Sequence, residues 1–170
     1  ELLRRHPEYT GNVVHAAVAY PSRQDVAEYR TYTELCQATS AAINDELGDV
    51  DWTPVRLDVV DDYPRSLATL GAADVLLVNS LRDGMNLVAK EGVLLSTDSA
   101  LVLSRETGAA DEMTTALLID PLDIEATAEA IHLALTMPDR ERRQRHDELV
   151  VVASALPPRA WLQQQLDALA

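Results

Sequence analysis

The residues best suited to chemistry lie between Leu81 and Glu91, in the run Leu-Arg-Asp-Gly-Met-Asn-Leu-Val-Ala-Lys-Glu. Asp83 precedes a glycine, which allows a ligand to approach the backbone closely. From Met85 onward the residues are good helix formers, and the free N–H groups and positive dipole at a helix start attract phosphate. Glu91 could accept hydrogen bonds from sugar hydroxyls. The segment therefore predicts a site for a phosphorylated sugar ligand.

Each charged residue considered for the site also has a simpler interpretation when it is taken alone. Asp83 could close an Asx-turn or cap a helix, and Glu91 could be a solvated helix residue. Arg23, which follows another predicted strand, could form a surface ion pair with Asp25 or Asp58, of little energetic value. Single residues therefore decide nothing here, and the site prediction depends on their combination.

The elements that must position these residues are predicted from hydrophobic periodicity. Apolar runs predict five strands, at 12–20, 54–60, 74–80, 100–104 and 116–120. Helical spacing predicts helices at 25–47, 64–70, 85–95, 124–135, 139–152 and 161–169, with a short one ending at 113. This alternation is typical of an α/β fold with a doubly wound, mostly parallel, Rossmann-like sheet.

Three polar clusters follow strands of the predicted sheet, at 22–23, 79–86 and 104–108. Ligands of open parallel sheets bind beyond the carboxyl ends of the strands, so the three clusters are expected along one rim. Neither G-x-G-x-x-G nor G-x-x-x-x-G-K-[ST] occurs, which disfavours a dinucleotide oxidoreductase and a P-loop NTPase. A G-x-S-x-G nucleophile elbow is also absent from the sequence.

Composition narrows the class of partner. The 170 residues suit one domain with a real core, and the formal charge of −14 argues against a nucleic acid or an anionic membrane. Cys36 is the one cysteine, which excludes an internal disulfide and a multi-cysteine metal site. The four histidines have no metal-ligand spacing, and His132 and His146 are predicted to be solvated because they lie on charged helices.

The chain carries no apolar run near the ~18 residues of a membrane span, and it opens without a signal-peptide pattern. Its first residues resemble the end of an amphipathic helix and contain no initiating Met. We therefore expect a cytoplasmic protein of which this chain is a piece.

Arg82 to Glu91 resembles the donor-site signature of the trehalose-6-phosphate synthases, retaining glycosyltransferases of the two-Rossmann-domain, GT-B type. Shorter stretches agree with that family in order along nearly the whole chain, at 21–23, 51–54, 73–75, 102–104, 108–110 and 134–137. The resemblance implies that residues 1–155 form the nucleotide-sugar-binding domain of such an enzyme. It also implies a C-terminal helix in 156–170 that crosses back to an N-terminal Rossmann domain.

The resemblance implies roles for individual residues. Asp83 would be the catalytic-site acid that holds hydroxyls of the transferred glucose, while the N–H groups of Leu87 and Val88 would meet the donor diphosphate. Glu91 would take the ribose hydroxyls, and Arg23 the phosphate of the acceptor sugar. The full implied donor-binding set is Asp83, Gly84, Met85, Asn86, Leu87, Val88, Ala89, Lys90 and Glu91.

The implied reaction moves glucose from UDP-glucose or GDP-glucose to glucose 6-phosphate with retention, giving trehalose 6-phosphate. No metal or other cofactor is expected, because protein cations and the helix dipole would stabilise the leaving diphosphate. Residues 58–64, which should pass the nucleotide base, are unusually acidic and leave the choice of uridine or guanosine open. Formation of a homo-oligomer is also left open.

The family's diphosphate-binding Arg and Lys lie upstream of the first strand, and this chain begins after them. The polypeptide alone is therefore expected to be inactive. The sequence leaves two other functions open. One is a related transferase with another acceptor, such as glycerol 3-phosphate or a cyclitol phosphate. The other is a non-catalytic nucleotide-sugar-binding module.

Overall fold

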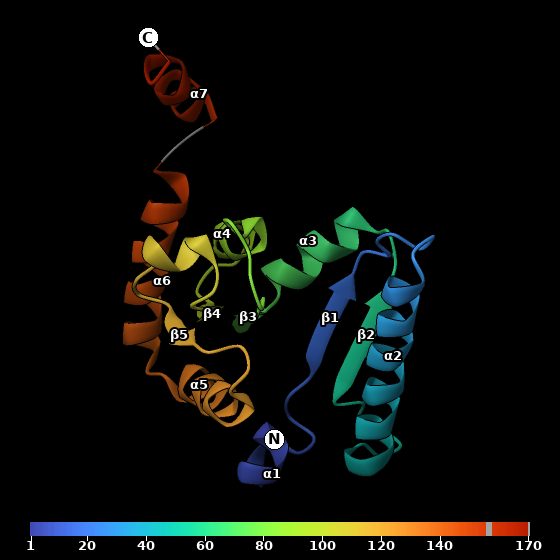
Figure 1. Cartoon of the computed structure of the whole chain (residues 1–170). Coiled ribbons are helices and arrows are strands. Elements are labelled where there is room, and N and C mark those ends of the chain that lie inside the picture. The colour runs from blue at the N-terminus through green and yellow to red at the C-terminus, as the bar shows by residue number, and fades with distance from the viewer. Residues whose placement is uncertain (156–157, 170) are drawn as a thin grey trace. The chain divides into compact units, whose positions relative to one another are not determined.

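The computed structural model describes residues 1–155 and 158–169. These residues divide into two compact units, one of residues 3–69 and the other of residues 1–2 with the chain from Leu70 onward. Figure 1 shows the elements of both units. The boundary falls within helix α3 (Tyr63–Gly71).

The unit of residues 3–69 is built on two parallel strands, β1 (His15–Ala19) and β2 (Val55–Val59). The long helix α2 (Ala27–Leu47) runs beside β2 (Figure 1). Asn44 of α2 fixes this contact, because its side chain accepts from Val55 N–H at 2.9 Å and donates to Val55 C=O at 2.8 Å. The helical turns α1 (Leu2–Arg5) and η1 (Pro7–Tyr9) precede β1.

The second unit contains a three-stranded parallel sheet in the order β3 (Val75–Val78), β4 (Ala100–Ser104), β5 (Leu117–Ile119). Its helical elements are α4 (Leu87–Leu95), η2 (Gly108–Asp111), α5 (Ile124–Thr136), α6 (Asp139–Ser154) and α7 (Pro158–Asp167). All described strand pairs are parallel, which confirms the predicted α/β class with parallel strands.

Strand β4 shows why this sheet needs helices on both faces. All five of its residues are buried, so no face can be left to water. Leu101 and Leu103 pack in one core cluster with residues of α4 and α6, including Val93 and Leu149. Their neighbours along the strand pack in a second cluster with α5. The alternation of β4 side chains thus places α4 and α6 on one face and α5 on the other.

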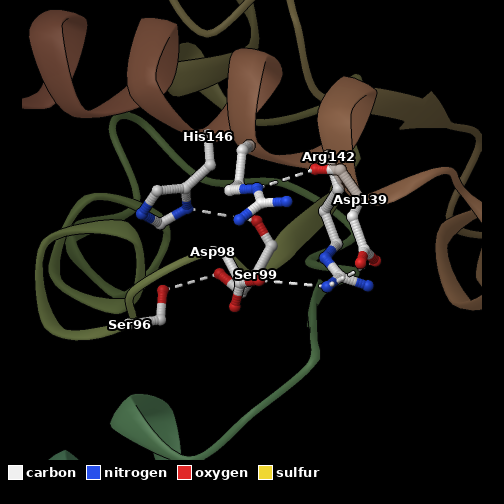
Figure 2. Close-up of polar contacts among 7 residues, drawn as sticks. Ser96, Asp98, Ser99, Asp139, Arg142 and His146 are labelled. Carbon is white, nitrogen blue, oxygen red and sulfur yellow. Dashed lines mark hydrogen bonds and ion pairs between the residues drawn. The ribbon is translucent and has the colours of Figure 1, made fainter.

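A buried polar cluster joins α6 to the segment just before β4 (Figure 2). The Nδ1 atom of His146 lies 3.1 Å from the carbonyl oxygen of Ser99, so Nδ1 must carry the proton. Ser96 Oγ donates to Gly92 C=O at 2.8 Å and lies 2.6 Å from Ser99 Oγ. His146 is 3% exposed, so the prediction that it is solvated was wrong.

The predicted elements are present, with bounds that differ by a few residues at most places. Helix α4 begins at Leu87 rather than Met85, and α2 begins at Ala27 rather than at residue 25. The five strands pair within two sheets, β1–β2 and β3–β4–β5. The predicted C-terminal segment 156–170 contains α7, while residues 156, 157 and 170 lie outside the described part. None of the described helices is long and apolar enough to cross a bilayer.

Candidate active site

The candidate site is organised by the loop that joins β3 to α4. Leu76 and Val78 anchor β3 in the core, so the loop leaves the sheet from a fixed point. At its other end, Asn86 caps α4, and its side-chain oxygen accepts from the N–H of Ala89 at 2.8 Å. The first N–H groups of α4, from Leu87 onward, have no acceptor within the helix and point out of its start.

The Asp83 carboxylate is held by two donors from its own loop. The N–H of Met85 donates to Oδ1 at 3.2 Å, which is the Asx-turn geometry, and Asn86 Nδ2 donates to Oδ2 at 3.1 Å. The simpler interpretation of Asp83 as an Asx-turn residue is therefore correct, while the helix cap is Asn86. An ionised carboxylate has about four lone-pair positions, so Asp83 keeps acceptor capacity for ligand hydroxyls.

A second loop, which follows β4, holds the Asp83 loop in place through backbone hydrogen bonds. Asp83 N–H donates to Glu106 C=O at 3.0 Å, Gly108 N–H to Asp83 C=O at 3.1 Å, and Ala109 N–H to Met85 C=O at 2.9 Å. The backbones approach so closely at Gly108 that a Cβ atom there would lie 2.1 Å from the carbonyl oxygen of Gly84. A glycine is therefore required at position 108.

An open pocket of about 380 Å³ lies at these two loops. Its lining combines two arginines and three acids with small residues, namely Arg82, Asp83, Gly84, Arg105, Glu106, Thr107, Gly108 and Asp111. Such a lining offers both donors and acceptors to a polyhydroxy ligand and cations to an anionic group. The predicted clusters at 79–86 and 104–108 are thus brought together at the carboxyl ends of β3 and β4.

The implied donor-binding residues differ in what the structure leaves accessible. Met85, Leu87 and Val88 are 48%, 61% and 47% exposed. Ala89 is fully buried and its N–H is taken by Asn86, while Lys90 forms a 2.8 Å ion pair with Glu112. Glu91 is half-buried on α4. The donor-binding roles of these residues stay predictions. The structure also shows Ala89 packed in the core and Lys90 paired with Glu112.

Arg23 lies in the unit of residues 3–69, at the turn after β1. Its backbone has a φ of 48°, in the left-handed region. The guanidinium donates to the Tyr29 hydroxyl at 2.8 Å and lies over that ring, 5.2 Å from its centroid. Of the two ion pairs considered for Arg23, the one with Asp58 is not formed. Asp58 pairs instead with Arg65, at 2.9 Å.

Sequence reasoning missed the backbone contacts that hold the two loops of the candidate site together. The backbone hydrogen bonds between residues 106–109 and residues 83–85 join positions more than 20 residues apart, and no local sequence pattern indicates them. The burial of His146 did have a signal, since Leu149 is three residues further on and belongs to the same helical face. That face proved to be the buried one.

The β3–β4–β5 sheet, covered by helices on both faces, and the acid-bearing loop that leads from β3 into the start of α4 define a Rossmann-like α/β domain. The family model described as glycosyltransferase family 20 matches residues 1–170. The chain belongs to glycosyltransferase family 20.

Individual relatives support this assignment. The chain is 37% identical over 152 residues to a UDP-forming α,α-trehalose-phosphate synthase A of Dictyostelium discoideum, covering 88% of this chain and 21% of that protein. A UDP-forming α,α-trehalose-phosphate synthase from Burkholderia xenovorans, in complex with glucose-6-phosphate, matches 99% of this chain with a TM-score of 0.94 and 34% identity. An E. coli structure bound with UDP-2-fluoro glucose matches 99% of the chain, with a TM-score of 0.94 and 35% identity. The chain spans 38% of each of these two structures.

Proposed function

We propose that the full-length protein transfers glucose from UDP-glucose to glucose 6-phosphate with retention, giving trehalose 6-phosphate, and that this chain supplies the donor site. The observation that carries the proposal is the Asp83 carboxylate, held at the edge of a pocket beside the start of α4, in a chain that belongs to family 20 throughout. The choice of uridine over guanosine follows relatives that are named UDP-forming.

In the proposed complex, Asp83 accepts hydrogen bonds from hydroxyls of the transferred glucose. The diphosphate lies at the start of α4, where the N–H groups of Leu87 and Val88 and the helix dipole stabilise its charge. Glu91, further along α4, accepts from the ribose hydroxyls, and Arg23 binds the phosphate of glucose 6-phosphate as a guanidinium fork. This arrangement requires no metal ion, because backbone donors and protein cations balance the leaving charge.

The reaction exchanges one bond for another at the anomeric carbon of the donor. The hydroxyl at C1 of glucose 6-phosphate attacks from the face that the diphosphate leaves. The bond from the anomeric carbon to the diphosphate oxygen breaks with its electron pair, and the proton of the attacking hydroxyl passes to that oxygen. Attack and departure on one face retain the configuration. The role of the protein is to orient both substrates and stabilise the diphosphate.

The proposal includes partners beyond this chain. An N-terminal Rossmann domain of the same protein would close the open side of the pocket. Helix α7 exposes Trp161, Leu162 and Leu166, at 49%, 52% and 52%, and these apolar residues suit the predicted return crossing to that domain. We place the reaction in the cytoplasm, and sedimentation of the full-length protein measures whether it forms a homo-oligomer.

The test uses purified full-length protein with glucose 6-phosphate and either UDP-glucose or GDP-glucose, with and without EDTA. We expect trehalose 6-phosphate by mass spectrometry and an α,α linkage by NMR, from UDP-glucose and at a rate that EDTA leaves unchanged. Product from GDP-glucose alone would overturn the donor assignment. Transfer only to glycerol 3-phosphate or a cyclitol phosphate would replace the acceptor, and nucleotide-sugar binding without transfer would leave a binding module.

A further inference from the structure

Asn86 uses every hydrogen-bonding group of its side chain. Oδ1 accepts from Ala89 N–H at 2.8 Å, while Nδ2 donates to Asp83 Oδ2 at 3.1 Å and to Ser80 Oγ at 3.2 Å. The orientation of the amide is fixed by chemistry, since only its oxygen can accept from an N–H and only its nitrogen can donate to a carboxylate. The side chain is largely buried, with Asn86 9% exposed.

The backbone of Asn86 is held in an unfavourable conformation. Its φ and ψ are 75° and 92°, and Asn86 and Arg23 are the non-glycine residues with positive φ in the described part of the chain. Such a conformation is strained for a residue other than glycine. Glycine would adopt it without strain. The cap alone does not explain the choice of asparagine, because glycine is also an accepted N-cap residue.

We propose that Asn86 is a positioning residue for Asp83, whose amide aims the carboxylate into the pocket and ties it to the start of α4. The inference rests on the proposed function and deepens it. The group that holds the glucose hydroxyls and the helix end that holds the diphosphate are thereby joined through one side chain. The glucose and the diphosphate of the donor are then held at a fixed separation, as transfer between oriented substrates requires.

The test is Asn86→Gly in the full-length protein. Glycine keeps the positive φ and an acceptable cap but removes the amide that contacts Asp83. We expect kcat/KM for UDP-glucose to fall by roughly 10²-fold, the effect of a misplacement near 1 Å. The dissociation constant of UDP, measured by calorimetry, should change less than about two-fold, because UDP lacks the glucose that Asp83 holds.

The matched control is Asp123→Gly, which removes the side-chain cap of α5, where Asp123 accepts from Ala126 N–H at 2.8 Å. It should lower the melting temperature without changing kcat/KM. Equal loss of UDP affinity and kcat/KM in Asn86→Gly would mean that Asn86 only supports the helix, and wild-type kcat/KM would equally overturn the inference.

The inference and the proposed function fail separately. If the wild-type protein transfers glucose to no acceptor, the proposed function fails. The positioning role is then judged from crystal structures of the wild type and Asn86→Gly. We expect the Asp83 side chain to leave its wild-type rotamer in the variant, and an unmoved carboxylate would overturn the inference.

Discussion

Asp83 meets two donors within its own loop and still has free acceptor positions toward the pocket. Its carboxylate is therefore oriented before a ligand arrives, at little further entropic cost. A hydroxyl that donates to this carboxylate makes a charge-assisted hydrogen bond, which is stronger than a neutral one. At the scale of single residues, the function of the site should depend on this one group.

Asp83→Ala should reduce transfer by roughly 10- to 10⁴-fold, the loss of one or two hydrogen bonds to a charged acceptor at about 1.5–3 kcal/mol each. The fold should survive, but the unfolding free energy should fall by about 1–3 kcal/mol, because Met85 N–H and the largely buried Asn86 Nδ2 lose their acceptor. Steady-state kinetics and thermal unfolding check both expectations.

Glu106→Ala gives the matched comparison, because Glu106 lines the same pocket but contacts the Asp83 loop through its backbone carbonyl. Its loss of activity should be much smaller than that of Asp83→Ala. Equal losses in the two variants would mean that the pocket needs negative charge in general rather than the Asp83 carboxylate.

At the scale of elements, the loop after β4 supports the loop after β3 through backbone hydrogen bonds. Gly108→Ala would place a methyl group 2.1 Å from the carbonyl oxygen of Gly84, so the two backbones must separate. We expect a loss of stability of about 1–3 kcal/mol and a clear fall in activity, since the Asp83 loop would shift with Gly84.

The control for this glycine is a second glycine of the same site. A Cβ atom on Gly84 would meet no heavy atom within 4 Å and Gly84 has no positive φ, so Gly84→Ala should leave the melting temperature near wild type. Comparable destabilisation by both substitutions would contradict the close approach at Gly108.

Helix α6 is attached to the opposite end of β4 by the buried His146 (Figure 2). His146→Ala should cost about 2–3 kcal/mol, because it leaves a cavity and a carbonyl of Ser99 without this donor. Asp147→Ala, at an exposed neighbouring position of the same helix, should change stability by less than about 0.5 kcal/mol. Chemical denaturation distinguishes these outcomes, and similar costs would show that His146 is not part of the core.

Elements were predictable from the sequence wherever one local rule was enough. Apolar runs located β3 and β4, and their parallel pairing followed from alternation with helices. The start of α4 was misplaced by two residues, because Asn86 caps the helix from a left-handed conformation that helix propensity does not encode. Contacts between distant segments, such as Asp83 with Glu106 or Lys90 with Glu112, depend on tertiary packing and could not be predicted locally.

At the scale of the whole molecule, the chain spans 38% of the E. coli structure that it matches over 99% of its own length. The site that it carries is open, since Leu87 and Val88 at the start of α4 are 61% and 47% exposed. In such an open site, water would screen the helix dipole and the contacts between protein charges and phosphate. Oriented attack also needs a second domain that holds the acceptor and excludes water.

The 170-residue chain expressed alone should therefore fail to transfer glucose from UDP-glucose to glucose 6-phosphate, while the full-length protein succeeds under the same conditions. Circular dichroism of the isolated chain must first show α/β secondary structure, so that a loss of folding is not mistaken for a loss of closure. Calorimetry should then give weak UDP binding, at least ten-fold weaker than in the full-length protein, because α4 contributes backbone donors but no closed surroundings. Transfer by the isolated, folded chain would mean that the open pocket is already complete, and the need for a second domain would have to be abandoned.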